Sequence, residues 1–371
     1  MNKIEFGDCR EIMRQWKVQG IKAQMCVTSP PYYGLRDYKT GTWIGGDESC
    51  DHINHINAHG GQRANRSQLG QVFQYTNSCE KCGAIREDLQ IGLEETPEEY
   101  IKAMVEVFRC VWDCLEDDGV LWVNIGDSYA RAGGDDSTKN HRWNGVAADG
   151  LKSGSTIPPK GLKEKDLIGI PWMLAFALRA DGWYLRQDII WQDIIWHKPN
   201  PMPESVRDRC TKAHEYIFLL SKSKQYFFDH EAIKEPLANP SRTNFQAGSR
   251  SNGVNDDRND NDLGERSKSA TYTNRNKRSV WTVNTKPYKG AHFAVFPSEL
   301  IVPCIMAGSK KGDVVLDPFM GSGTTAMVAI KHGRQYLGCE LNPDYAELQQ
   351  ERIDSMSCIA SFHSLFDEDE N

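Results

Sequence analysis

The turn Ser29-Pro30-Pro31-Tyr32 combines groups that can orient a flat ring bearing an amino group. It follows an apolar run over residues 23–27 that is typical of a buried strand. The Ser29 hydroxyl and the Pro30 carbonyl can accept hydrogen bonds from an amino group, and Tyr32 offers an aromatic face. Two adjacent prolines stiffen the turn and so limit misplacement of these groups. Proline turns beside a core tyrosine are common, so this turn alone is weak evidence for a site.

A second segment, Asp317-Pro318-Phe319-Met320-Gly321-Ser322-Gly323-Thr324-Thr325, has the composition of a nucleotide-binding turn. It follows the apolar run 314–316, and its glycines allow a tight turn before a helix that begins at Thr324. The next expected strand, 335–339, ends at Glu340, where an acidic residue is suited to holding the hydroxyl pair of a ribose. A lone Gly-x-Gly pair is a weak signal, whereas the full string is a specific one.

Together, the two segments resemble those of the β class of DNA amino-methyltransferases, in which the catalytic segment precedes the cofactor segment. The resemblance implies S-adenosylmethionine as cofactor, and a Rossmann-like α/β fold whose mixed, mostly parallel sheet is flanked by helices. It also implies that Asp317 approaches the methionine amino group and that residues 292–297 complete the methionine pocket. The cofactor-binding residues expected on this basis are Asp317, Pro318, Phe319, Gly321, Gly323, Thr324, Glu340, Asn342, Phe293 and Pro297.

The resemblance further implies methyl transfer to the exocyclic amino nitrogen of a base swung out of double-stranded DNA. The lone pair of such a nitrogen is delocalised into the ring, so catalysis must orient its N–H bonds, and no strong base is needed. The catalytic residues expected are Ser29, Pro30, Pro31 and Tyr32. In this family, Ser before Pro-Pro-Tyr favours cytosine N4, whereas Asp or Asn favours adenine N6. Some Ser-containing members methylate adenine, so adenine N6 remains the alternative to cytosine N4.

Four residues have the spacing of a structural zinc site. Cys50-Asp51-His52 and Cys79-Glu80-Lys81-Cys82 supply two pairs of ligands, and tetrahedral Zn²⁺ is commonly held by four such groups. The segment between them is too polar to form a core, so a metal ion would organise it. His55 or His59 could replace His52. The alternative is exposed cysteines in a flexible insert.

Alternating helix and strand patterns predict an α/β sheet with helices on both faces. Helices are expected over 98–115, 170–178 and 296–306, and strands over 119–125 and 184–196. The expected organisation is a catalytic part (1–48 and 93–235), a zinc-binding insert (49–92), a target-recognition region (236–290), a cofactor-binding part (291–356) and an acidic tail (357–371).

A perfect tandem repeat precedes His197. Gln187-Asp188-Ile189-Ile190-Trp191 is followed at once by Gln192-Asp193-Ile194-Ile195-Trp196, whereas the family pattern carries one copy. Five is an odd number, so in one continuous strand the second copy would place each side chain on the opposite face. A bulge or a longer loop would absorb the extra residues.

Three polar segments are expected to surround the substrate. Residues 126–165 are rich in Gly, Ser and Asp and form a candidate lid. Residues 197–201, with Arg207, Arg209 and Lys212, resemble the family segment that faces DNA. Between 235 and 290 there are ten Lys or Arg against six Asp or Glu, which favours a nucleic-acid contact, although a disordered linker would have a similar composition.

The overall composition restricts the possible functions less than the motifs do. The formal charge of −7 argues mildly against a nucleic-acid partner, but a base-flipping enzyme needs only one basic cleft. The sequence has no apolar run of membrane-spanning length and no signal-peptide pattern, and its eleven cysteines are typical of a reduced, cytoplasmic protein. A homodimer and a cognate restriction enzyme are further expected partners.

Three other functions compete with this interpretation. An RNA or protein-glutamine methyltransferase would use Asn or Asp before Pro-Pro-Tyr. A carbon-5 cytosine enzyme needs a Pro-Cys nucleophile, and the one such pair, Pro303-Cys304, falls in an apolar helix pattern. A nucleic-acid-binding protein with an inactive methyltransferase core is favoured only by the repeat before His197.

Overall fold

The computed structural model describes residues 1–34, 38, 40–47, 49–52, 78–79, 81–130, 161–187, 194–201, 207–237, 273–285 and 296–364. Within these residues a mixed sheet has the order β1-β13-β12-β2-β5-β8-β7-β11, with β6 also paired to β8. The pairs are parallel except those that β8 makes with β5, β6 and β7. The strands are β1 (Asn2–Phe6), β2 (Ala23–Thr28), β5 (Leu115–Ile125), β6 (Tyr184–Gln187), β7 (Ile194–His197), β8 (His214–Ser221), β11 (Val280–Thr282), β12 (Val314–Asp317) and β13 (Gln335–Glu340).

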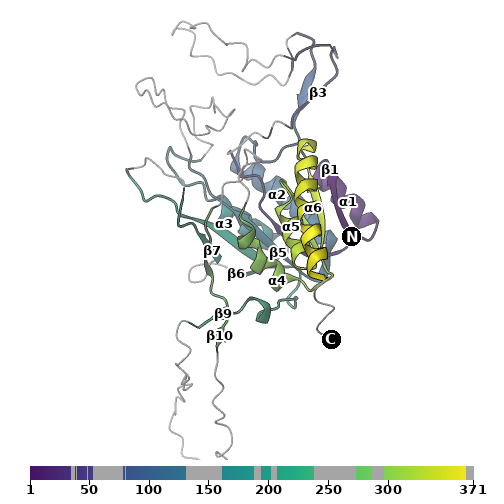
Figure 1. The fold of residues 1–371 in the computed structure, drawn as a ribbon. Coiled ribbons are helices and arrows are strands. Elements are labelled where there is room, and N and C mark those ends of the chain that lie inside the picture. Colours follow the sequence, from purple (N-terminus) through teal and green to yellow (C-terminus); the bar gives the residue numbers. More distant parts are fainter. Residues whose placement is uncertain are drawn as a thin grey trace, which may run out of the picture.

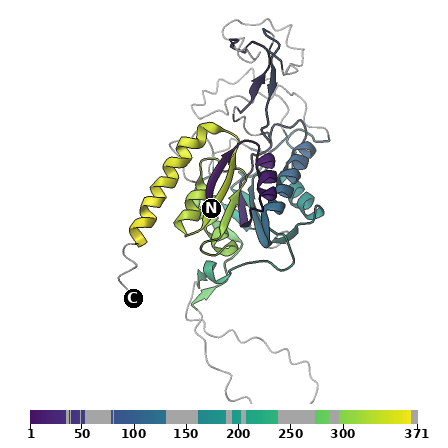
Figure 2. The same ribbon diagram turned by 90° about the vertical axis from the view of Figure 1, so that its right-hand side faces the viewer.

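Helices cover both faces of this sheet, as predicted (Figures 1 and 2). The first group packs as α1 against α2 and α2 against α3, and the second as α4 against α5 and α5 against α6. Their bounds are α1 (Cys9–Val18), α2 (Pro97–Cys114), α3 (Ile170–Ala180), α4 (Ser298–Gly308), α5 (Thr324–Lys331) and α6 (Ala346–Ser364). The mixed, mostly parallel sheet between two helical layers confirms the Rossmann-like fold class.

Alternation along the strands divides the core between the two faces. Leu121 and Val123 of β5 pack with the cluster that contains the residues of α1 to α3. Val120 and Trp122 pack with the cluster of α4 and α5. This two-sided burial makes a strand such as β5 an almost continuous apolar run, which is why its sequence pattern is easily recognised.

Two small ribbons lie outside the main sheet. β3 (Thr42–Ile44) pairs with β4 (Ile85–Glu87), and β9 (Glu235–Pro236) pairs with β10 (Asn274–Arg275). Figure 1 shows β3 at one end of the molecule and the β9–β10 ribbon at the other. Short 3₁₀ helices span Glu231–Ile233 and Pro343–Tyr345.

Most expected elements are present, with two differences. The helix expected after Asn342, to about residue 354, continues to Ser364. The single strand expected over 184–196 is wrong, because β6 ends at Gln187 and β7 begins at Ile194. The residues between them, 188–193, lie outside the described part of the chain.

Strand register accounts for the tandem repeat. Both β6 and β7 pair with the same edge of β8, where Gln187 lies opposite Leu219 and Ile194 lies opposite Ile217. Six residues, 188–193, connect Gln187 to Ile194, whereas only Phe218 separates Leu219 from Ile217 on β8. The excess is five residues, which is the length of one copy. A chain with a single copy could therefore pair β7 with β8 in the same register.

Deleting one copy, residues 187–191, should therefore leave the fold intact. Gln192 would take the place of Gln187 on β8, and the loop entropy involved changes stability by only about 1 kcal/mol. Urea denaturation measures the free energy of unfolding. As a control, Trp196→Ala should cost about 3–5 kcal/mol, because this buried side chain donates to the Val283 carbonyl at 2.8 Å. A deletion as damaging as Trp196→Ala would show that the repeat is structurally required.

Candidate active site

The two predicted segments meet at one edge of the sheet. Strand β2 leads into residues 29–32, the catalytic turn, and β12 leads into residues 317–324, the cofactor turn. These strands are parallel neighbours, with Leu316 opposite Cys26, so their carboxyl ends lie side by side. The Thr28 hydroxyl donates to Asp317 Oδ1 at 2.6 Å and so joins segments 289 residues apart.

The Asp317 carboxylate links both turns to α5. Thr325 donates to Oδ2 at 2.6 Å, and the Phe319 amide donates to Oδ1 at 3.0 Å. Only 1% of Asp317 is exposed. Burial raises the pKa of this carboxyl, and the bonds from Thr28, Thr325 and Phe319 oppose that shift. Asp317 therefore has a structural role in addition to any contact with a ligand.

Two glycines and a second carboxylate fix the backbone conformation of the cofactor turn. Gly321 and Gly323 have φ angles of 53° and 80°, a region that favours glycine. Glu340 Oε2 accepts from the Gly321 amide at 2.7 Å, and Oε1 accepts from the Asn342 amide at 2.9 Å. Burial raises the pKa of Glu340, and these two amides oppose the shift. Each oxygen keeps a lone pair for a further donor.

One hydroxyl of the cofactor turn is available for a ligand. The Thr324 Oγ1 atom is buried and has no hydrogen-bond partner among the described residues. Buried polar groups are nearly always satisfied, so such an atom calls for an explanation. Thr324 begins α5, whose preceding residue, Gly323, makes no side-chain cap. A polar ligand bound at the turn could form hydrogen bonds with the Thr324 hydroxyl and with the uncapped backbone amides at the start of α5.

The remaining predicted cofactor residues lie around this turn or outside the described chain. Pro318 and Phe319 belong to the turn itself, and Phe319 packs on the core beneath it. Asn342 accepts from the Asp344 amide at 2.9 Å and so caps a 3₁₀ turn. Pro297 is buried at the start of α4. Phe293 lies outside the described residues.

The catalytic turn is fixed by its neighbours. The buried Tyr100 of α2 donates its hydroxyl to the Pro31 carbonyl at 2.8 Å. Helix α2 begins at a capping box, in which Thr96 accepts from the Glu99 amide and Glu99 accepts from the Thr96 amide. On the other side, the Gly34 amide donates to the Gly92 carbonyl at 2.9 Å. The prolines therefore sit on a rigid support.

Sequence reasoning did not single out Glu215, which lies near the start of β8 and contacts Tyr32 of the catalytic turn. The Tyr32 hydroxyl donates to Glu215 Oε2 at 2.6 Å, and Asn124 Nδ2 donates to the same oxygen at 3.3 Å. Lys198 forms an ion pair with Oε1. Burial and the Glu215 charge raise the pKa of Tyr32 well above its ordinary value. The only indication of Glu215 in the sequence was a single carboxylate at the start of an apolar strand.

The four predicted zinc ligands come together on the β3–β4 ribbon. The ligand atoms of Cys50, His52, Cys79 and Cys82 all lie within 4.8 Å of one another. The two sulfurs of Cys50 and Cys79 are 3.8 Å apart, and Cys82 Sγ is 3.3 Å from His52 Nδ1. Thiolates bound tetrahedrally to zinc at about 2.3 Å would be about 3.8 Å apart. The donor set and its spacing fit a structural zinc ion.

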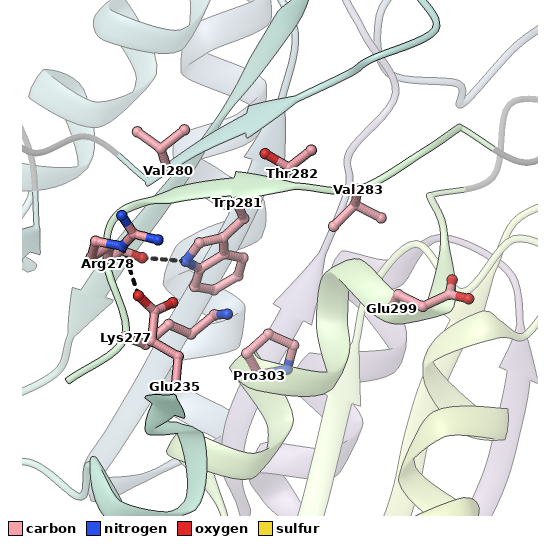
Figure 3. A pocket seen from close by; sticks show the side chains of 9 residues that line it. All are labelled: Glu235, Lys277, Arg278, Val280, Trp281, Thr282, Val283, Glu299 and Pro303. Atoms are coloured by element: carbon pink, nitrogen blue, oxygen red, sulfur yellow. Dashed lines mark hydrogen bonds and ion pairs between the residues drawn. The ribbon is translucent and has the colours of Figure 1, made fainter. Parts of the chain in front are cut away.

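A hollow of about 230 Å³ lies elsewhere, between β11, α4 and the β9–β10 ribbon (Figure 3). Trp281 forms its floor, and Glu235 binds Arg278 at its rim. Its nine lining residues include none of the predicted catalytic, cofactor or metal residues. The predicted site residues therefore lie at the two turns and not at this hollow.

Other predicted segments are only partly described. Residues 131–160 of the candidate lid, and residues 238–272 and 286–290 of the target-recognition region, lie outside the described chain. In the described part, no helix is both long and apolar enough to cross a membrane.

Comparison with known proteins agrees with this geometry. The DNA methylase family model N6_N4_Mtase matches residues 23–351. The chain is 42% identical to the type II methyltransferase M.SmaI of Serratia marcescens, over 95% of this chain and 90% of the relative. It is 39% identical to M.Cfr9I of Citrobacter freundii, over 94% and 86%. The chain therefore belongs to the N6/N4 family of DNA methylases, the amino-methyltransferases of DNA.

Solved structures support the fold. The putative DNA modification methylase TTHA0409 of Thermus thermophilus gives a TM-score of 0.50 at 20% identity, covering 96% of this chain and 94% of the other. The cytosine-N4-specific PvuII DNA methyltransferase gives a TM-score of 0.51 at 15% identity, covering 97% and 91%. At these identities the likeness extends to the fold alone.

Replacing Thr28 by Val should test the bond that joins the two turns. The substitution keeps the shape of the side chain and removes its hydroxyl, and a hydrogen bond to a charged group contributes about 1.5–3 kcal/mol. We expect the free energy of unfolding to fall by that amount in urea denaturation. Thr42→Val, at an exposed position of β3, is the control and should change stability by less than about 0.5 kcal/mol. Equal effects of the two substitutions would contradict the importance of the Thr28 bond.

Proposed function

We propose that this protein transfers a methyl group from S-adenosylmethionine to the N4 atom of a cytosine in double-stranded DNA. The observation that carries the proposal is the contact of the two turns, since the Thr28–Asp317 bond joins the end of β2, which leads into residues 29–32, to the start of residues 317–324. Membership of the DNA methylase family gives the reaction class. The cofactor, the target base and base flipping are parts of the proposal.

The residues of the cofactor turn fit the proposed cofactor. The Thr324 hydroxyl can bond to a polar group of the ligand, and the free lone pairs of Glu340 can accept from ribose hydroxyls. Asp317 retains an acceptor site for an amino group, while Phe319 and Pro297 offer apolar contacts. When bound, S-adenosylmethionine supplies a methyl group on a positively charged sulfur.

The catalytic turn would orient the amino group of the base. The Ser29 hydroxyl and the Pro30 carbonyl accept its two N–H bonds, which turns the nitrogen lone pair toward the methyl carbon. Tyr32 supports the ring of the base by stacking. The N–C bond would form as the methyl–sulfur bond breaks, so positive charge would pass from sulfur to nitrogen, and the nitrogen would then lose one of its protons to solvent. No nucleophilic side chain would be required.

Ser29 supports cytosine over adenine. In the family, Ser at this position favours cytosine N4, and adenine N6 remains the second candidate. Carbon-5 chemistry is disfavoured because Cys304 is buried in α4 with only 1% exposed. An inactive core is disfavoured because β7 keeps its register on β8 despite the repeat.

We also propose that Cys50, His52, Cys79 and Cys82 bind a structural zinc ion. The ion would join the two strands of the β3–β4 ribbon at its far end from the catalytic turn. It has no part in the chemistry, because methyl transfer needs no activated water. Residues 49–92 would then form the zinc-binding insert and 236–290 the target-recognition region.

The product identifies the target base. Unmethylated DNA incubated with labelled S-adenosylmethionine and digested to nucleosides should yield N4-methylcytosine, measured by mass spectrometry. Tyr32→Ala should lower turnover far more than cofactor affinity. N6-methyladenine would reverse the base while keeping the mechanism. Labelling of RNA or protein, with none in DNA, would contradict the proposal.

Metal analysis tests the zinc site. We expect one zinc per chain, and Cys79→Ser with Cys82→Ser should remove it and lower the temperature of unfolding of the ribbon. Cys210→Ser is the matched control, because this cysteine is exposed and lies outside the cluster. Purified protein without zinc, or a double variant as stable as the control, would refute the site.

A further inference from the structure

The ring of Tyr32 is held by groups from two strands besides its own turn. Its hydroxyl donates to Glu215 on β8 at 2.6 Å and lies 3.5 Å from Asn124 Oδ1 on β5. A Cβ atom at Gly126, just after β5, would lie 2.6 Å from Tyr32 Cε2. The ring edge therefore rests directly on the Gly126 backbone, and only glycine leaves room for it.

Glu215 is itself anchored on its far side. Lys198, just after β7, forms an ion pair with Glu215 Oε1 while its ammonium group lies 4.3 Å from the centre of the Trp196 ring. The side chains of Lys198 and Glu215 are 19% and 14% exposed. Partly buried ion pairs contribute little net stability, and their best attested use is to fix one arrangement over others.

The topology explains why this pair reaches the catalytic turn. Strand β8 is antiparallel to β5, so β8 begins at the edge where β5 ends, and Ile125 pairs with Tyr216. Strand β7 runs antiparallel to β8 and ends at the same edge, where His197 pairs with His214. Lys198 and Glu215 thus extend from neighbouring strand ends toward Tyr32.

We propose that Glu215, held by Lys198, is a positioning residue that fixes the plane of the Tyr32 ring against the target base. The proposal rests on the proposed function, in which Tyr32 stacks on that base. Glu215 acts through the Tyr32 hydroxyl and not on the reacting atoms. Lys198 holds the Glu215 carboxylate in place, so the segment after β7 is coupled to the catalytic turn.

A double-mutant cycle tests this coupling. Glu215→Ala and Tyr32→Phe should each lower kcat by about 10-fold to 100-fold, because misplacing a group by about 1 Å can have effects of that size. The affinity for S-adenosylmethionine, measured by calorimetry, should stay within about twofold. The double variant should be no slower than the slower single variant, because both changes remove one interaction. If the kcat losses of the two single variants multiply in the double variant, the proposal is wrong.

Two further variants separate positioning from stability. Gly126→Ala should displace the ring and reproduce the kcat loss without touching Glu215. Asp181→Asn breaks the ion pair with Arg109, in which Asp181 is also 14% exposed, and should leave kcat unchanged. Glu215→Gln keeps an acceptor for Tyr32 and should restore part of the kcat lost in Glu215→Ala. If Gln rescues nothing while stability falls, Glu215 is merely structural.

A readout of ring position keeps this test independent of turnover. Protein labelled with 3-fluorotyrosine gives a fluorine resonance for Tyr32, assigned by its absence in Tyr32→Phe. Glu215→Ala and Lys198→Met should shift that resonance, and Asp181→Asn should not. An unmoved resonance in Glu215→Ala would overturn the positioning role. If the wild-type protein methylates no DNA while Glu215→Ala still shifts the Tyr32 resonance, the proposed function alone is refuted.

Discussion

The candidate active site depends on one buried carboxylate. Asp317 accepts from Thr28 at the end of β2 and from Thr325 in α5, so it connects the catalytic turn, the cofactor turn and the helix that supports it. Hydroxyl donors on both oxygens compensate for burying the group. A carboxylate is suited to this position because it accepts several hydrogen bonds at once without supplying a proton.

The other contacts of the site extend from the same sheet edge. Tyr100 supports Pro31 from the layer of α1 to α3, whereas Thr325 and Glu340 support the cofactor turn from the other side. The parallel strands end at this edge and the antiparallel β8 begins there. Groups from seemingly unrelated parts of the chain therefore meet without any long loop having to carry them.

Much of the fold follows from the sequence, because buried parallel strands are apolar runs and the two turns have specific strings. The Cys50, His52, Cys79 and Cys82 cluster was also predictable, since ligand spacing is a local property. Glu215 and Asn124 were not recognised, because their importance depends on which strands are neighbours and on the direction of β8. The effect of the repeat could not be predicted either, since only the pairing with β8 shows that one copy is excess.

The position of the Tyr32 ring affects which partner, the protein or the nucleic acid, would change conformation during recognition. The Tyr32 ring rests on the Gly126 backbone and donates its hydroxyl to Glu215, so it is held in one orientation. For the proposed reaction, the conformational rearrangement then falls on the duplex, which must open and bend until the base reaches a stationary platform. Discrimination would arise partly from how easily each DNA sequence deforms, and not only from contacts with its bases.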